Sequence, residues 1–191
     1  MPISCPLSPV SVLLLAGGRG QRMGGRDKGL VKWRGRPMIA WLHDAVRPLT
    51  DDLIISCNRN AERYRDFSDR VVGDQEVGFP GPLAGIRAGL AVARHPWLLV
   101  LPCDAPKVDC ALLEDMRCAA QAEHPLMLRQ GSQWQPLFCL IPRSLLPDIE
   151  QAWRDGQRSA RSLLTTLGAV PLDCADNDPR LANLNTPDLL E

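Results

Sequence analysis

A glycine-rich segment near the start of the chain contains the residue types that bind phosphate. Residues 15–29 read LAGGRGQRMGGRDKG. Glycines tolerate positive φ and leave backbone N–H groups accessible, so the main chain can close around phosphate oxygens. Arg19, Arg22, Arg26 and Lys28 supply positive charge that would balance a bound phosphate. The segment is therefore predicted to be a phosphate-binding loop.

The spacing within this loop differs from the two most common phosphate-binding patterns. A P-loop needs lysine followed by serine or threonine, whereas Lys28 lies between Asp27 and Gly29. The dinucleotide pattern G-x-G-x-x-G fails because three other residues follow Gly20. A kinase-like protein and an NAD-dependent dehydrogenase are disfavoured for these reasons. A solvated surface loop is the structural alternative, which the position directly after a buried apolar run makes less favourable.

A second candidate for chemistry is Asp104, which follows the apolar run 97–101. A carboxylate at the end of a buried strand is costly unless it faces a cation or solvent. Mg²⁺ is commonly held by one or two carboxylates together with phosphate oxygens, so a single aspartate can suffice. Taken alone, Asp104 could equally be a turn residue or the N-cap of a helix.

Other polar residues lie at comparable positions but are weaker candidates. Asn58 follows the apolar run 53–57, and Asp74 follows a short apolar pair, where ordinary turn residues are common. Near the end of the chain, Asn183 and Asn185 would share one face of an extended segment. Capping of a last helix is the alternative for this pair.

The order of apolar runs indicates which elements position these residues. Continuous apolar runs at 12–15, 53–57, 71–72 and 97–101 predict buried strands, and helical spacing predicts helices at 38–46, 61–67, 86–94 and 109–122. Further strands are expected at 126–128, 134–141 and 170–172, helices at 142–153 and 158–167, an extended piece at 181–184 and a helical turn at 187–190. This alternation predicts an α/β fold, a three-layer α/β/α arrangement around a mostly parallel, Rossmann-like sheet. Ligands bind such sheets at the carboxyl ends of the strands, where the candidate residues gather.

Length and composition limit the remaining possibilities. A chain of 191 residues suits a single domain covering 1–191, with residues 1–10 expected to form a flexible N-terminal extension. The 22 basic residues balance the 22 acidic ones, so no nucleic acid or membrane partner is expected. The seven cysteines are scattered without a C-x-x-C pair and are interpreted as reduced thiols. No signal peptide or membrane span is apparent, and we expect a cytoplasmic protein.

The motifs together resemble one known family. Leu15-Ala16-Gly17-Gly18, Arg22-Met23-Gly24-Gly25 and Asp27-Lys28 resemble the glycine-rich segment of the molybdenum cofactor guanylyltransferases. The resemblance continues in Pro102–Pro106, in Gly81–Gly85 and in Asn183–Pro187, and it implies the fold of the nucleotidyltransferases. Transferases for sugars, isoprenoid precursors and the cytidylyl form of the cofactor share a looser version of the first motif.

This resemblance implies a reaction and a role for each candidate residue. The family transfers GMP from GTP to molybdopterin, with or without molybdenum, and releases pyrophosphate in a Mg²⁺-dependent reaction. It implies Lys28, Arg22 and Asp104 as catalytic residues, Asp104 as the Mg²⁺ ligand, and Asn183 and Asn185 on the pterin side. The implied GTP contacts are Leu15, Ala16, Gly17, Gly18, Lys28, Asn58, Asp74 and Asp104. Molybdopterin-handling proteins and apo-molybdoenzymes are the implied protein partners. The alternatives are a cytidylyl- or sugar-nucleotide transferase of the same fold and a non-catalytic carrier of nucleotide or pterin.

Overall fold

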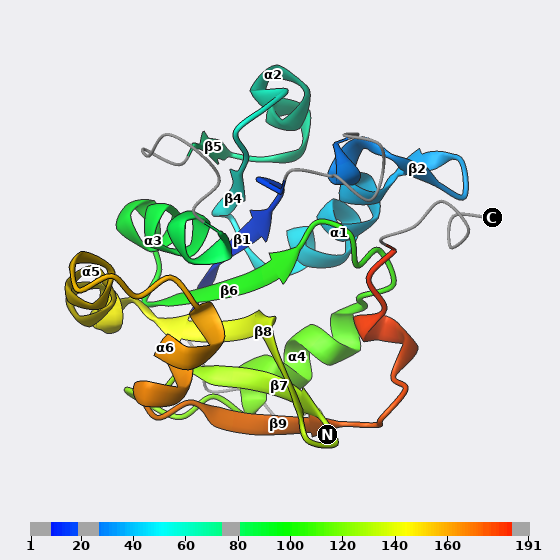
Figure 1. Ribbon diagram of the computed structural model, residues 1–191. Coiled ribbons are helices and arrows are strands. Elements are labelled where there is room, and N and C mark those ends of the chain that lie inside the picture. Colours follow the sequence, from blue (N-terminus) through cyan, green and yellow to red (C-terminus); the bar gives the residue numbers. More distant parts are fainter. Residues whose placement is uncertain (1–8, 19–26, 74–80, 185–191) are drawn as a thin grey trace.

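The fold is built on one seven-stranded sheet with helices on both faces (Figure 1). The computed structural model describes residues 9–18, 27–73 and 81–184. Its strands are β1 (Val10–Leu15), β4 (Leu53–Ser56), β5 (Arg70–Val72), β6 (Trp97–Pro102), β7 (Leu126–Gln130), β8 (Gln133–Pro142) and β9 (Val170–Cys174). Their order across the sheet is β5-β4-β1-β6-β8-β7-β9. Among the strands of the described residues, only β8 runs against the others, so the prediction of a mostly parallel sheet is confirmed.

The helices form two layers, each packed on its own hydrophobic core. Helices α1 (Met38–Val46) and α4 (Cys110–Cys118) cover one face, and α3 (Pro82–Val92), α5 (Leu146–Arg154) and α6 (Ala160–Thr166) cover the other (Figure 1). Alternate residues of β1 enter opposite cores: Val12 and Leu14 pack toward α1, whereas Leu13 packs toward α3. A strand that is apolar on both faces reads as a continuous apolar run, which is why its position could be predicted.

Short elements complete the chain. A hairpin of β2 (Lys32–Trp33) and β3 (Arg36–Pro37) precedes α1, and its turn residues Arg34 and Gly35 both have positive φ, 49° and 79°. The other short elements are α2 (Ala61–Tyr64) and the 3₁₀ helices η2 (Lys28–Leu30), η3 (Arg47–Leu49), η4 (Arg65–Phe67), η5 (Arg143–Leu145) and η6 (Pro179–Leu181).

Some element boundaries differ from the prediction. β1 begins at Val10, which is fully buried, so this residue belongs to the sheet and not to an N-terminal extension. α3 begins at Pro82 and not at residue 86, because proline is well tolerated in the first turn of a helix. α4 ends at Cys118, earlier than expected. Instead of an extended piece at 181–184, η6 ends at Leu181 and irregular chain follows. The turn expected at 187–190 lies outside the described residues.

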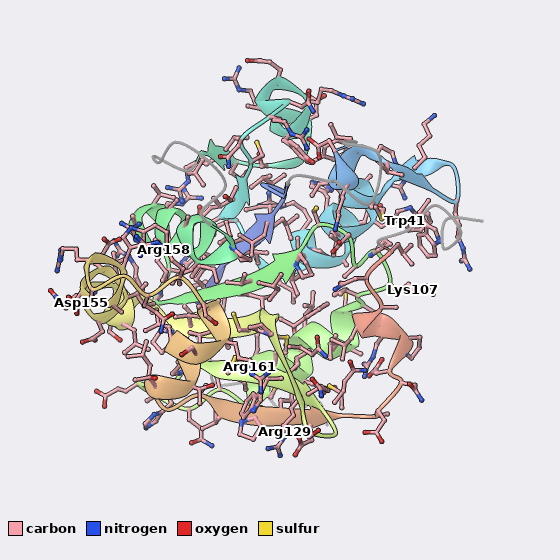
Figure 2. All side chains as sticks on the ribbon, in the orientation of Figure 1. Trp41, Lys107, Arg129, Asp155, Arg158 and Arg161 are labelled. Atoms are coloured by element: carbon pink, nitrogen blue, oxygen red, sulfur yellow. The ribbon has the colours of Figure 1, made fainter. Side chains whose placement is uncertain are left out.

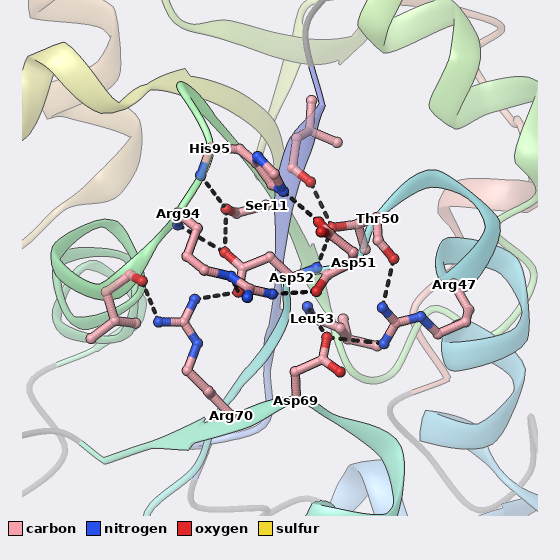
Figure 3. Close-up of polar contacts among 12 residues, drawn as sticks. Ser11, Arg47, Thr50, Asp51, Asp52, Leu53, Asp69, Arg70, Arg94 and His95 are labelled. Atoms are coloured by element: carbon pink, nitrogen blue, oxygen red, sulfur yellow. Dashed lines mark hydrogen bonds and ion pairs between the residues drawn. The ribbon is translucent and has the colours of Figure 1, made fainter.

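A buried polar cluster joins the amino ends of four parallel strands (Figure 3). Asp52, which precedes β4, has a fully buried side chain. It accepts hydrogen bonds from Ser11 of β1, Arg70 of β5 and the backbone N–H of Arg94, which precedes β6. Burial alone would raise the pKa of Asp52, but these hydrogen bonds and the Arg70 charge outweigh it and hold the pKa below the ordinary 3.8. The cluster stabilises the edge of the sheet that faces away from the strands' carboxyl ends.

The charged surface residues labelled in Figure 2 lie on different sides of the molecule. The Arg158 guanidinium carbon lies 3.8 Å from the ring centroid of Trp153 of α5, whereas Arg129 of β7 forms a bidentate pair with Asp173 of β9, the edge strand of the sheet. Exposed Lys107 lies on the side of α1 (Figure 2). Within the described residues, no helix is long and apolar enough to cross a membrane.

Candidate functional site

A pocket of about 330 Å³ opens at the carboxyl ends of β1, β4 and β6. It is lined by Leu15, Gly17, Gly18, Lys28, Ser56, Gly81, Pro82, Gly85, Pro102, Cys103, Asp104 and Leu137. The connection from β1 to β4 runs through α1 on one face, and the connection into β6 runs through α3 on the other. The pocket therefore lies where the winding of the sheet reverses, the place at which open α/β sheets bind ligands.

The central feature of the pocket is an ion pair between Lys28 and Asp104. Lys28 Nζ lies 3.0 Å from Asp104 Oδ2, although the two residues are 76 positions apart in sequence. The Asp104 side chain is only 9% exposed and that of Lys28 24%, so the pair is largely shielded from water. Asp104 follows β6, and its carbonyl oxygen accepts a hydrogen bond from Leu184 N at 2.8 Å. The pair brings a cation suited to phosphate and a carboxylate suited to a metal ion to the same point.

The first residues after β1 contribute backbone to the pocket. Leu15 O accepts a hydrogen bond from Cys103 N at 3.1 Å, and Ala16 N donates to Ser56 O at 2.7 Å. The N–H of Ala16 is thus engaged with the β4 segment. Gly17 and Gly18 line the pocket and carry no side chain that would block a ligand.

Of the remaining candidate residues, the structure describes Asn58 and Asn183. Asn58 is exposed and is not part of the pocket lining. Asn183 is next to Leu184, which hydrogen-bonds Asp104, and within the described part of the chain its side-chain oxygen is buried without a hydrogen-bond partner. Arg22, Asp74 and Asn185 lie outside the described residues.

The pocket also contains residues that the sequence interpretation missed. Ser56, the last residue of β4, is 2% exposed and lines the pocket two positions before Asn58. Its signal was a hydroxyl at the end of an otherwise apolar run. Leu137 of β8 also lines the pocket, next to a register shift in the β7–β8 pairing. No local sequence pattern indicates this register shift.

The donor set fits a hard divalent cation that completes its shell from a ligand. No group of three or more His, Cys, Asp or Glu side chains gathers anywhere in the described residues. Asp104 is the carboxylate that the described lining provides. Mg²⁺ takes one or two carboxylates and fills its other positions with phosphate oxygens and water, so the single aspartate is compatible with it.

Comparison with known proteins identifies the family. Residues 12–170 match the family model described as the MobA-like NTP transferase domain. The chain belongs to this family. Among curated relatives of this MobA-like transferase, the molybdenum cofactor guanylyltransferase of Pseudomonas aeruginosa strain PAO1 is 67% identical over 192 residues, covering 100% of this chain and 96% of the relative.

Solved structures give the same fold. Molybdopterin-guanine dinucleotide biosynthesis protein A from Archaeoglobus fulgidus matches the MobA-like transferase with a TM-score of 0.77 at 25% identity, covering 94% of each chain. The 2-C-methyl-D-erythritol 4-phosphate cytidylyltransferase of Thermus thermophilus matches with a TM-score of 0.71 at 20% identity, covering 96% of each chain. This second likeness concerns the fold alone. The predicted family and fold class are confirmed.

Proposed function

We propose that this MobA-like transferase transfers GMP from GTP to molybdopterin, forming molybdopterin guanine dinucleotide and pyrophosphate. The observation that carries the proposal is the Lys28–Asp104 pair in a pocket at the reversal of the sheet. The 67% identity over the full chain to a molybdenum cofactor guanylyltransferase supports the choice of reaction.

The chemistry requires positioning and charge neutralisation more than proton transfer. The terminal phosphate of molybdopterin is an anion at neutral pH, so it can attack the α-phosphorus of GTP without a general base. Pyrophosphate then leaves with the bonding electrons. Preorganised charges aimed at the developing negative charge are the main catalytic resource in such reactions.

We assign the triphosphate to Lys28 and to the backbone of Gly17 and Gly18. Lys28 Nζ is held 3.0 Å from Asp104 Oδ2, and both residues line the pocket together with these glycines. We assign Mg²⁺ to Asp104, where the ion would neutralise charge on the triphosphate. Arg22 is proposed as a further cation for the triphosphate.

The other proposed contacts are less central. Leu15 and Ala16 would contact the nucleotide through the end of β1, and Asn58 and Asp74 are proposed to contact guanine or ribose. Asn183 is proposed on the pterin side, supported by its buried side-chain oxygen and by its place next to Leu184, which hydrogen-bonds the Asp104 carbonyl. Asn185 is proposed to act with it.

We also propose a cytoplasmic location and a transient handover between molybdopterin-handling proteins and apo-molybdoenzymes. The cysteines of the described residues are reduced thiols, and two of them, Cys110 and Cys118, are exposed, which is consistent with a reducing compartment. Burial raises the pKa of the Cys103 and Cys139 thiols, so both stay protonated and unreactive.

The test is incubation of the purified protein with Mg²⁺, GTP and molybdopterin, followed by identification of the pterin dinucleotide and measurement of pyrophosphate. Parallel reactions with CTP, UTP and ATP test the base. We expect pyrophosphate release with GTP above the other nucleotides. A preference for CTP or UTP would favour another transferase of this fold, and tight binding without pyrophosphate would favour a carrier.

A further inference from the structure

Asp27, the residue directly before Lys28, is held by two side chains from the segment after β4. The hydroxyl of Tyr64 donates a hydrogen bond to Asp27 Oδ1. Asn60 Nδ2 donates to the other carboxylate oxygen, Oδ2, at 3.0 Å. Both oxygens of a residue that is itself outside the pocket lining are thereby engaged. An aspartate so held restrains the backbone on which Lys28 is carried.

Tyr64 is placed to reach this carboxylate from inside the protein. It is the single tyrosine of the chain and is fully buried. Gly29 makes the approach possible, because a Cβ at Gly29 would lie 2.6 Å from the Tyr64 hydroxyl oxygen and 3.3 Å from Cys103 Cβ. The tyrosine hydroxyl, the end of the loop and the residue before Asp104 therefore meet at one point.

The same segment also contacts the other side of the glycine-rich loop. Arg59 donates a hydrogen bond to Gly18 O at 3.2 Å. Asn60 has a left-handed backbone, φ 54° and ψ 31°, a conformation that asparagine tolerates better than most residues. Gly18 and Asp27 are the described residues that flank 19–26. Residues 59–64 thus hydrogen-bond the described residues on both sides of the loop, Gly18 and Asp27.

The position of Lys28 depends on the contacts that anchor the short turn that carries it. η2 is a single 3₁₀ turn, closed by Leu30 N to Asp27 O at 3.1 Å and Val31 N to Lys28 O at 3.1 Å. Turns of this kind have weak hydrogen-bond geometry. A lysine ammonium is a point charge on a flexible stem, so its location depends on the backbone beneath it.

We infer that Tyr64 is a positioning residue, whose hydrogen bond to Asp27 fixes the turn at Lys28 so that the ammonium group faces Asp104 and the pocket. Asn60 supports the same carboxylate from the exposed side. The inference deepens the proposed function and rests on it, in that Lys28 is taken to act on the triphosphate. Burial, with the nearby Cys103 and Asp27 as further causes, raises the pKa of Tyr64, so the phenol remains a neutral donor.

The deciding experiment is a double-mutant cycle of Tyr64→Phe with Lys28→Ala. Phenylalanine keeps the buried ring and removes only the hydroxyl. We expect Tyr64→Phe alone to lower kcat/KM for pyrophosphate release by about tenfold, the scale of one hydrogen bond to a charged group. In the Lys28→Ala background the same substitution should have no further effect, because a residue acting through Lys28 has nothing left to position.

Thr50→Val is the matched control for loss of a buried hydroxyl. Thr50 Oγ1 donates to Val10 O at 2.6 Å and accepts from Asp52 N at 2.9 Å, at the opposite edge of the sheet. This variant should lower Tm and keep the wild-type kcat/KM. Asn60→Gly serves as a second test that retains the left-handed backbone. It should lower kcat/KM in the same direction as Tyr64→Phe even if the latter folds poorly.

Two results would overturn the inference: wild-type kcat/KM in both Tyr64→Phe and Asn60→Gly, or equal losses from Tyr64→Phe with and without Lys28. Thermal protection by GTP and Mg²⁺ provides a readout that is separate from the reaction. If the wild type forms no pterin dinucleotide, the proposed function fails, but the cycle can still be completed on this protection. The protection should fall with Tyr64→Phe and should not fall further in the Lys28→Ala background.

Discussion

Replacing Gly85 by alanine should close part of the pocket while leaving the fold intact. Gly85 lies in α3 and lines the pocket. A Cβ there would meet Ser56 Oγ at 2.7 Å and Leu15 Cδ2 at 2.8 Å, and both residues are also part of the lining. Ordinary van der Waals contact begins at 3.4 Å, so the Ser56 side chain must give way by about 0.7 Å.

The two opposing effects on stability can be compared. Alanine in a helix interior favours folding over glycine by about 0.5–1 kcal/mol. Overpacking of a buried site costs about 1–3 kcal/mol. The net loss is therefore about 0–2.5 kcal/mol, which lowers Tm by no more than about 5–10 °C for a chain of this size. A displacement approaching 1 Å at a reacting centre can cost about 100-fold in rate, so the effect on GTP use should exceed the effect on stability.

Gly89→Ala is the matched control in the same helix. Its Cβ would lie 2.7 Å from Leu13 Cδ2, an equally close contact, but Leu13 belongs to the core and not to the pocket lining. Each variant is assayed by thermal unfolding without ligand, by GTP titration with Mg²⁺, and by pyrophosphate release below both transition temperatures. We expect a 10- to 100-fold loss of kcat/KM for Gly85→Ala, on the scale of such displacements, and little change for Gly89→Ala. Unchanged GTP affinity in Gly85→Ala, or equal losses in both variants, would refute the reasoning.

Further variants test the ion pair and the polar cluster. Asp104→Asn should retain the fold, because the backbone carbonyl of residue 104 still accepts a hydrogen bond from Leu184 N. The rate of pyrophosphate release should fall by about 100-fold or more. Turnover at the wild-type rate would remove Asp104 from the proposed metal role. Asp52 has a lowered pKa, so its contribution to stability is complete above the ordinary 3.8 and is lost as the pH falls through the lower folded value. Asp52→Asn should therefore lower Tm at neutral pH and reduce the fall of Tm at acid pH. An equal fall of Tm at acid pH in the variant and the wild type would contradict this role of Asp52.

The approximate positions of the main secondary-structure elements could be predicted because the signals are local. The run that became β1 is apolar on both faces, and such runs identify strands buried between two helical layers without knowledge of their neighbours. The glycine-rich loop follows β1 and Asp104 follows β6. Because the carboxyl ends of parallel strands share one edge of the sheet, both could be predicted to lie at the same site, and residues of both line the pocket. Residue types and spacing thus indicated the family, which is confirmed, and predicted a phosphate site, which stays a prediction.

Tertiary structure alone decided which side chains meet. The contact of Lys28 with Asp104 spans 76 positions and depends on β1 and β6 being neighbours, a fact of strand order that no local pattern encodes. Ser56 entered the pocket through the register of β4 against β1, where a shift of one residue would have turned its side chain to the other face. The contact of Tyr64 with Asp27 needed the close approach that Gly29 permits. The sequence therefore determined the elements and the kind of chemistry, whereas long-range register and packing determined which residues can carry it out.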